Sequence, residues 1–385
     1  MAEARPLEPA PVRGPIFIIG AMGSGTTLLR LMLDSHRTIA VPHETGFMRS
    51  YNAMRFVPFK WTGRGWARRL GWSDEELDEE LRHFFDRIFT RYVERTGKQR
   101  WGEKTPFHTW HILNIQRLFP DSVFVAIVRH PGASIWSNMN RFRHPAGKAV
   151  FHYERYNKEI ARQAAANPRQ TVILRYEDMI LRTEQAMREL LDWLGEPWDP
   201  AVLEHHEVQA QRDHRRIEGK TRADDAIDAS RIAKWVERMP ADERELVKQR
   251  LGRLPEFFGY SMDDPLALTP VHDRGTLVWG GDDVAARVNA YPGLDIETRM
   301  PVPIYERYYH PRNYTMIRNP WGGARWPKPE DRDRPRAEAE EKAAATDVEP
   351  TPLKKAARPL VNRLPAPARR GLRKAARRIR ARSAG

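Results

Sequence analysis

The stretch that most constrains the fold is a glycine-rich turn between an apolar run and a helical pattern. Residues 15–19 (PIFII) form a short apolar run typical of a buried strand, and residues 20–25 (GAMGSG) follow as a turn. Over residues 26–36, leucine and methionine recur at helical spacing. Such a strand, loop and helix leave backbone N–H groups free at the helix N-terminus, where the helix dipole favours negative charge. We therefore expect the loop to bind an anion.

The residue that follows the turn narrows the choice of anion. Gly20, Gly25 and Thr27 have the spacing of the nucleotide-binding motif G-x-x-x-x-G-K-[ST], but Thr26 stands where that motif has its lysine. In P-loop kinases and ATPases this lysine reaches the β- and γ-phosphates of a triphosphate. The sequence therefore disfavours a kinase or NTPase, whereas an ordinary turn in a doubly wound sheet stays open on this stretch alone.

Further apolar runs predict the rest of the sheet. Ser122–Val128 (SVFVAIV) and Thr171–Leu174 (TVIL) are typical of buried strands, and helical patterns follow each of them. Strands separated by helices predict an α/β fold with a P-loop-type parallel β-sheet flanked by helices on both faces. Two of the helices that we expect span Thr183–Leu194 and Lys234–Leu254.

A long helix is expected from Ser73 onward, where S-D-E-E fits a capping box. Its apolar residues recur at helical spacing and predict a stripe that packs in the core. The residues of this stripe are Leu77, Leu81, Phe84, Phe85, Ile88 and Tyr92.

Composition divides the chain into four segments. Residues 1–14 are polar and rich in proline and predict a disordered N-terminus, and residues 15–263 carry the strand and helix patterns of the main domain. Residues 264–326 are dense in proline, glycine and aromatic residues without periodicity, which predicts an irregular but ordered appendage. Residues 327–385 predict a charged linker and a basic tail with one helix-forming stretch.

The net charge of +14 belongs almost entirely to the tail. Residues 351–385 hold three lysines, nine arginines and no acidic residue, which is +12 and leaves only +2 for residues 1–350. The folded part therefore gives no argument for specific nucleic-acid binding. The tail has the composition of a segment that contacts an anionic membrane surface, and a solvated tail is the alternative.

Two features that the sequence lacks limit where the protein can act and which chemistry it can use. The sequence has no cysteine, which excludes disulfides, thiolate catalysis and cysteine-ligated metals. It also has no signal-peptide pattern and no run of 18 apolar residues. We expect a cytoplasmic protein, peripheral to the inner face of the membrane if the tail binds lipid.

The string GSGTTLLRLMLDSH, followed by PHET, resembles the 5′-phosphosulfate loop of sulfotransferases that use 3′-phosphoadenosine 5′-phosphosulfate (PAPS). Within that family it most resembles the branch of tyrosylprotein sulfotransferases and their bacterial relatives. The resemblance implies PAPS as co-substrate and a loop that binds its phosphosulfate. The loop residues concerned are Gly23, Ser24, Gly25, Thr26 and Thr27; family members often carry Arg or Lys in the position of Gly23.

A second signature lies about 105 residues further on. The string VRHPGASIWS, from Val128 to Ser137, resembles the family's 3′-phosphate site. The resemblance implies that Arg129 and Ser137 grip the 3′-phosphate, with Arg141 as a further cation. A guanidinium presents a planar fork of donors to a phosphate, and a hydroxyl adds another hydrogen bond.

The resemblance also implies catalytic roles for Glu44 and Lys104. Glu44, in PHET, matches the family's general base, which takes the proton of the acceptor hydroxyl. Lys104, in WGEKTP, matches the family's catalytic lysine, whose ammonium stabilises charge on the leaving phosphate. His43 is a competing base, but adjacent residues of an extended segment point to opposite faces, and we favour Glu44.

Two later segments resemble nucleotide contacts of the family. Tyr176 follows the third strand in R-Y-E-D, and Lys234 precedes a tryptophan in a K-W pair that closes over the nucleotide in relatives. Upstream of this pair lies a polar run that reads equally as a mobile flap or a solvated loop. Its cations are Arg212, Arg215, Arg216, Lys220 and Arg222. The histidines show no metal-ligand spacing, and we expect no metal.

These observations predict a sulfotransferase that moves a sulfuryl group from PAPS to an acceptor hydroxyl by in-line displacement. The alternatives are a P-loop kinase or NTPase with an atypical loop, and a non-catalytic nucleotide-binding protein recruited to anionic surfaces by its tail. The acceptor stays open among small-molecule, glycan, lipid and peptide hydroxyls, because cofactor motifs do not specify it.

Overall fold

The structure is a computed structural model that describes residues 7–10, 13–56, 66–211, 226–264, 266–294 and 296, without the side chains of residues 56 and 211. The five cations predicted for a flap and the basic tail at 327–385 lie outside these residues. Within the described residues, no helix is both long enough and apolar enough to span a lipid bilayer.

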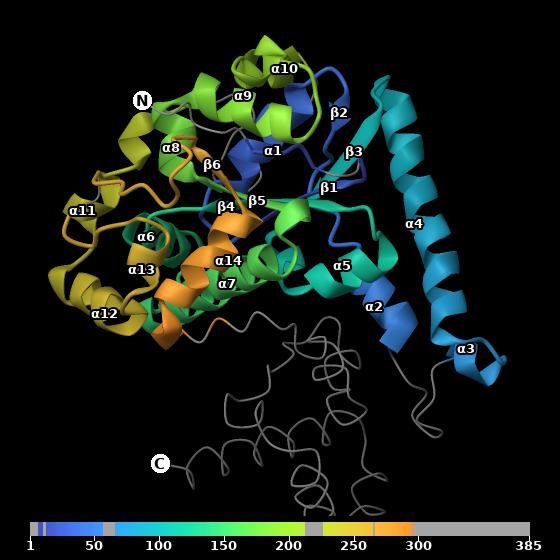
Figure 1. The fold of residues 1–385 in the computed structure, drawn as a ribbon, viewed down its shortest axis with the longest axis horizontal. Helices are drawn as coiled ribbons and strands as arrows, with labels where there is room; N and C mark the ends of the chain where they lie inside the picture. The colour runs from blue at the N-terminus through green and yellow to red at the C-terminus, as the bar shows by residue number, and fades with distance from the viewer. Residues whose placement is uncertain are drawn as a thin grey trace, which may run out of the picture. The chain divides into compact units, whose positions relative to one another are not determined.

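A six-stranded sheet forms the centre of the fold, in the order β2-β3-β1-β4-β5-β6 (Figure 1). The strands are β1 (Ile16–Gly20), β2 (Ile39–Ala40), β3 (Arg100–Lys104), β4 (Val123–Val128), β5 (Thr171–Arg175) and β6 (Val278–Gly280). All pairs are parallel except β5 with β6, which is antiparallel. The predicted α/β fold with a parallel sheet is confirmed, and β1, which enters the glycine-rich loop, lies between β3 and β4.

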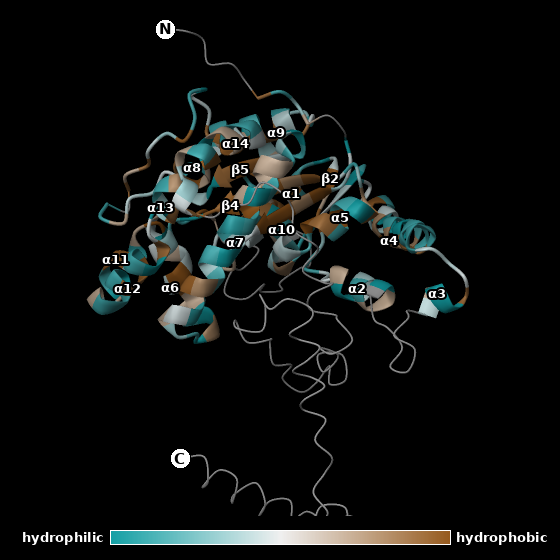
Figure 2. Ribbon diagram, turned by 60° about the horizontal axis from the view of Figure 1, so that its bottom comes forward, coloured by the Kyte–Doolittle hydropathy of each residue, from teal (hydrophilic) through white to brown (hydrophobic). Residues whose placement is uncertain are grey.

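Helices cover both faces of this sheet (Figures 1 and 2). The main ones are α1 (Thr26–Ser35), α2 (Met48–Phe56), α3 (Trp66–Arg69), α4 (Asp74–Thr96), α5 (Ile112–Leu118), α6 (Pro131–Phe142), α7 (Ala146–Ala166), α8 (Tyr176–Leu181), α9 (Thr183–Trp193), α10 (His205–Gln211), α11 (Lys234–Arg238), α12 (Ala241–Leu251), α13 (Leu254–Phe257) and α14 (Gly281–Ala290). In Figure 2 the strands are hydrophobic and many helices are hydrophilic on their outer sides. The helix expected over Thr183–Leu194 is confirmed, since α9 spans Thr183–Trp193.

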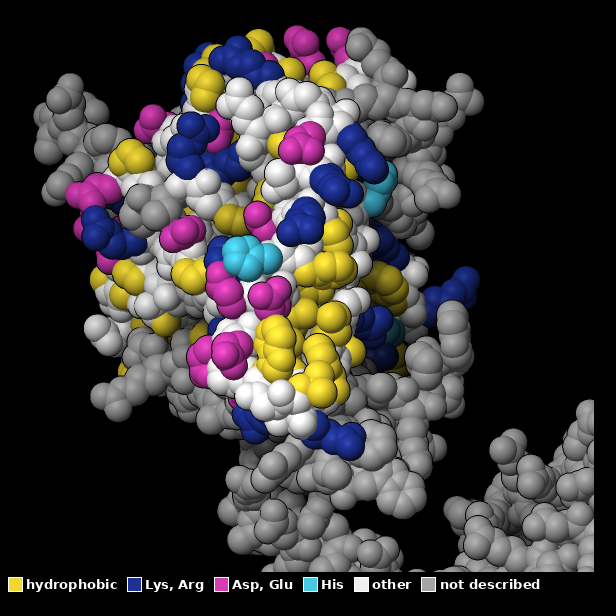
Figure 3. Space-filling view, turned by 90° about the vertical axis from the view of Figure 1, so that its right-hand side faces the viewer, with side chains coloured by type: hydrophobic (Ala, Val, Ile, Leu, Met, Phe, Trp, Pro, Cys, Tyr) yellow, Lys and Arg dark blue, Asp and Glu magenta, His cyan; other side chains and the backbone are white. Residues whose placement is uncertain are grey.

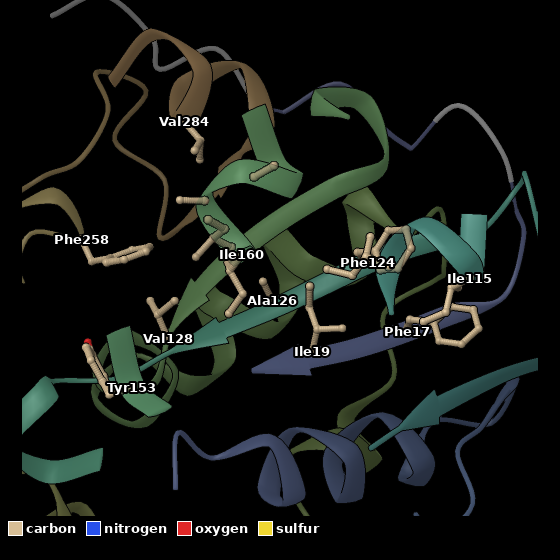
Figure 4. Close-up of a cluster of buried hydrophobic side chains, with 14 of the residues drawn as sticks. Phe17, Ile19, Ile115, Phe124, Ala126, Val128, Tyr153, Ile160, Phe258 and Val284 are labelled. Carbon is tan, nitrogen blue, oxygen red and sulfur yellow. The ribbon is translucent and has the colours of Figure 1, made fainter. Parts of the chain in front are cut away.

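The two faces of the sheet hold two separate cores. Successive residues of a strand point to opposite faces, so β1 sends Phe17 and Ile19 to one side and Ile16 and Ile18 to the other. The first core lies against α4, α5, α7 and α14, and Figure 4 shows its side chains along β1 and β4. The second lies against α1, α8 and α9. Both faces are thus anchored around the strand that carries the loop.

The C-terminal boundary of the domain differs from the prediction. An irregular appendage was expected from residue 264, but the described part of it contains β6 and α14. Trp279 of β6 is fully buried and Val284 of α14 packs into the first core, close to Ile160 of α7 (Figure 4). A strand of three residues is too short to show periodicity, which is why the pattern missed it.

The N-terminal segment also packs in its described part, contrary to the expected disorder. The backbone N–H of Ala10 donates to the carbonyl oxygen of Trp193 at 2.8 Å, and Arg13 pairs with Glu196 at 2.8 Å.

The helix expected over 234–254 is interrupted, because Pro240 stands at the N-cap of α12 and has no N–H to continue α11.

The predicted core stripe of α4 is only partly correct. Ser73 does form the capping box, and Leu77, Leu81 and Phe85 are buried. However, Phe84 is 53% and Ile88 is 49% exposed, because the buried line of the helix continues through Phe89 and Val93 instead. Figure 3 shows the side of the molecule where α4 lies, with hydrophobic side chains beside acidic and basic ones.

Candidate active site

The glycine-rich loop joins the end of β1 to the start of α1 and bends through two left-handed glycines. Gly23 has φ 87° and Gly25, the N-cap of α1, has φ 101°. No side chain among the described residues caps α1, so its first N–H groups are available to an anion. Ser24, Thr26 and Thr27 are buried along the same turn, and the Oγ of Ser24 donates to Ala21 O at 2.6 Å.

Both glycines are required by their neighbours as well as by their backbone angles. A Cβ on Gly25 would lie 2.4 Å from Cδ2 of Tyr176, and a Cβ on Gly23 would lie 3.2 Å from the Oγ of Ser137. Tyr176 and Ser137, both predicted from the sequence, are therefore brought against the loop. An Arg or Lys at position 23 would be strained at this φ.

Arg129 connects the two predicted anion-binding signatures. It follows β4 directly, and its Nη1 donates to the carbonyl oxygen of Gly23 at 3.0 Å. Its guanidinium lies over the ring of Tyr176, 4.1 Å from the centroid. Its Nε is buried and has no hydrogen-bond partner among the described residues. A buried donor of this kind, next to a loop with free amides, fits a phosphate ligand.

The segment that leads into α11 covers the end of β4. The carbonyl oxygen of Arg231 accepts from Nη2 of Arg129 at 2.6 Å. Trp235 stacks on His130 with ring centroids 4.9 Å apart and leaves room only for a glycine at position 132. Lys234 itself is exposed, and its side chain makes no hydrogen bond or ion pair with the described residues.

Lys104 links the loop to the predicted base. Its side chain is fully buried at the end of β3. Its Nζ donates to Oε1 of Glu44 at 2.5 Å and to Oγ1 of Thr27 at 3.3 Å. The side chain of Glu44 is 44% exposed, so the carboxylate has one side on the lysine and another open to solvent. One cation thus joins a loop hydroxyl and a solvent-accessible carboxylate.

Aromatic residues form a wall beside this chain of contacts. Trp110 and Tyr156 pack against Ala21 of the loop, with Phe107 next to them. Burial raises the pKa of Tyr156, while the charge of Arg155 opposes this shift and that of Glu44 adds to it. The guanidinium of Arg155 lies 5.1 Å from the centroid of the Trp110 ring.

Other predicted residues have different partners. Arg30, a buried cation on α1, donates to the carbonyl oxygen of Val41 at 3.1 Å. Arg141 lies over the ring of Phe142 at 5.2 Å. Within the described ranges no group of three His, Asp or Glu residues has the arrangement of a metal site.

Sequence reasoning missed two residues that hold this site together. Glu103 is completely buried and contacts the PHET segment, and Arg231 supplies the carbonyl that holds Arg129. Glu103 carries a signal in hindsight, because a carboxylate next to a candidate catalytic lysine needs a partner if it is buried. Arg231 acts through its backbone, which no side-chain pattern reveals.

Comparison with known proteins points to one family. A family model described as Sulfotransferase family matches residues 15–200. Protein-tyrosine sulfotransferase 1 of Danio rerio is 29% identical over 275 residues, which cover 67% of this chain and 75% of that protein. Protein-tyrosine sulfotransferase 1 of Homo sapiens is 28% identical over 283 residues, covering 67% and 72%. The solved sulfotransferase domain from the curacin biosynthetic pathway aligns with a TM-score of 0.46 and 20% identity, over 67% of this chain and 99% of that domain.

Proposed function

Because the chain belongs to the sulfotransferase family and is an enzyme of sulfuryl transfer, we propose that its donor is PAPS and its acceptor a hydroxyl group. The observation that carries this proposal is the pair of contacts made by Lys104, which joins Thr27 of the loop to the carboxylate of Glu44. A donor phosphate held by the loop and an acceptor held by the base would then meet at one buried ammonium.

The residues present fit PAPS in two places. The loop amides with Ser24, Thr26 and Thr27 would hold the phosphosulfate, where the uncapped start of α1 favours negative charge. Arg129, with its unpaired buried Nε, and Ser137 would hold the 3′-phosphate. Tyr176, which packs under Arg129, and Lys234 complete the proposed nucleotide contacts.

The proposed reaction is an in-line displacement at sulfur. Glu44 accepts the proton of the acceptor hydroxyl, and the hydroxyl oxygen forms a bond to sulfur while the bond from sulfur to the bridging phosphate oxygen breaks. The electron pair of that bond stays on the departing 5′-phosphate, where Lys104 and the loop amides stabilise it. The products are a sulfate ester and 3′-phosphoadenosine 5′-phosphate (PAP). Glu44 is favoured over His43 because it is the residue that contacts Lys104.

For the acceptor we propose a phenolic hydroxyl. The relatives named above are protein-tyrosine sulfotransferases, so their acceptor is a tyrosine. The wall of Phe107, Trp110 and Tyr156, which packs against Ala21 of the loop, suits an aromatic ring, because aromatic pairs gain from stacked or edge-to-face contact.

A transfer assay tests donor and acceptor together. The purified chain is incubated with PAPS and separate acceptors, namely a tyrosine peptide, 4-nitrophenol, a hexose and a long-chain alcohol, and PAP and the sulfated product are measured by mass spectrometry. We expect product from the phenolic acceptors, and transfer slower by about 100-fold or more with Glu44→Gln. Transfer to the hexose or the alcohol alone would reject the acceptor proposal and keep the donor, whereas no turnover and no binding of PAP would reject both.

A further inference from the structure

The residue next to the proposed catalytic lysine is a buried carboxylate. Glu103 lies on β3, immediately before Lys104, and has no solvent exposure. An ionised carboxylate out of water is costly unless hydrogen bonds or a cation compensate it. The contacts that compensate the buried carboxylate of Glu103 therefore indicate its role.

Two of its four contacts come from Thr45, in the segment that carries Glu44. One oxygen of Glu103, Oε1, accepts from the backbone N–H of Thr45 at 3.2 Å and from its Oγ1 at 2.9 Å. The same oxygen accepts from Oγ1 of Thr105 at 2.7 Å, while that hydroxyl oxygen accepts from the N–H of Gly46 at 3.2 Å. The other oxygen, Oε2, lies 2.5 Å from Nδ1 of His108.

These contacts keep Glu103 ionised. Burial alone would raise the pKa of Glu103, but His108 and the hydrogen bonds from Thr105 and Thr45 outweigh it and hold the pKa below its ordinary value. Oε1 accepts all three hydrogen bonds, while Oε2 lies beside the His108 ring and has no hydrogen-bond partner among the described residues.

Two pairs of adjacent residues meet at the end of β3. Glu44 contacts Lys104, and the next residue, Thr45, contacts the preceding residue, Glu103. Neighbouring residues of an extended chain point to opposite sides, so the two pairs hold the segments together on both sides. A shift of one segment along the other would break both pairs at once.

We propose that Glu103, held by His108, is a positioning residue that sets Glu44 opposite Lys104 by binding Thr45. This inference rests on the proposed function, in which Glu44 is the base. The loop needs such an anchor, because Gly46 follows with φ 59°, no described residue comes within 4 Å of a Cβ placed on it, and the Glu44 side chain is partly in solvent.

The test uses the full chain and substitutes Thr45 and Glu103 in separate variants. Thr45→Val keeps the shape and the backbone N–H but removes the hydroxyl donor, Thr45→Ser restores it, and Glu103→Gln removes the charge. The matched control is Glu184→Gln, an exposed glutamate paired with Arg188 on α9. For each variant kcat is measured by transfer to 4-nitrophenol, PAP affinity by calorimetry, and the melting temperature by scanning calorimetry.

A loss of kcat of about 10-fold or more is expected for Thr45→Val, because small misplacement of a reacting group costs up to about 100-fold in rate. PAP affinity should stay within about two-fold of wild type, and Thr45→Ser should recover most of kcat. The double variant Thr45→Val with Glu103→Gln should be no slower than Glu103→Gln alone, because the two changes remove the same interaction.

Wild-type kcat in Thr45→Val would overturn the inference, and so would equal losses of kcat and PAP affinity in both single variants, which indicate general loosening of the fold. If the wild type neither binds PAP nor transfers sulfuryl groups, the proposed function itself fails. The two failures are therefore distinguishable.

Discussion

Arg129 donates from Nη1 to the carbonyl oxygen of Gly23 at 3.0 Å, so the cation at the end of β4 touches the loop at the end of β1. The contact follows from the parallel pairing of β1 with β4, which places their carboxyl ends side by side. Two motifs far apart in the chain thereby form one basic site at the edge where α/β sheets bind ligands.

Removing the buried ammonium should stop the chemistry while leaving the nucleotide site in place. Lys104→Ala is expected to lower kcat by about 100- to 1,000-fold, because a preorganised donor at the developing charge is lost. Steady-state transfer to 4-nitrophenol measures the effect, and PAP titration shows whether the site survives. A change in kcat smaller than about three-fold would contradict the role of Lys104.

The assignment of the base is tested by comparing neighbours. Glu44→Gln keeps an acceptor oxygen for Lys104 but cannot take a proton, so kcat should fall by about 100-fold or more. His43→Gln should stay within about three-fold of wild type. The opposite ranking of the two variants would make His43 the base.

The loop should not tolerate a side chain at its second left-handed glycine. Gly25→Ala places a Cβ 2.4 Å from the Tyr176 ring at φ 101°, and we expect a loss of about 2 kcal/mol in the free energy of unfolding. Gly147→Ala is the control, since position 147 is on α7 with none of the described residues within 4 Å of an added Cβ, and alanine there should stabilise by about 0.5 kcal/mol. Urea unfolding measures both; equal effects would reject the crowding argument.

Stability should depend on pH through His130. Burial lowers the pKa of His130 to about 4 from 6.5; the carbonyl of Ser261 opposes the shift and Arg129 adds to it. Because the unfolded chain takes up the proton first, stability is lost as pH falls from 6.5 to 4, by about 3 kcal/mol for this group.

His130→Asn keeps an oxygen that can accept from the N–H of Gly132, as Nδ1 does now, but does not titrate. The stability difference between wild type and this variant, from urea unfolding at several pH values, should therefore shrink as pH falls. A difference that stays constant between pH 7 and pH 4 would contradict a buried neutral imidazole.

Strands that are apolar throughout were predictable, and strands defined by tertiary contacts were not. β4 (VFVAIV) is a continuous apolar run and β5 (TVILR) has one at its centre, which the sequence alone identifies. β3 reads RWGEK, and its charges are buried only because each has a distant partner: Arg100, for example, donates to Leu194 O at 2.8 Å. β6 has three residues and depends on pairing with β5.

The residues of the site also divide into those that the sequence predicts and those that only tertiary contacts reveal. Residues proposed to touch the donor lie in local motifs, and the fold brings Ser24, Arg129, Ser137 and Tyr176 together around the loop. Residues that position them act across long separations, as Glu103 does on Thr45 and as the backbone of Arg231 does on Arg129. A motif shows what a residue can bind, but only the fold shows what holds it there.

The most direct test of the central claim is calorimetric titration with PAP, beside ATP with Mg²⁺, on the wild type and on Arg129→Ala. We predict that the wild type binds PAP more tightly than ATP, and that Arg129→Ala weakens PAP binding by about 10- to 100-fold, as expected for one charge-assisted phosphate contact. No binding of PAP, or a clear preference for ATP, would contradict a site built for PAPS.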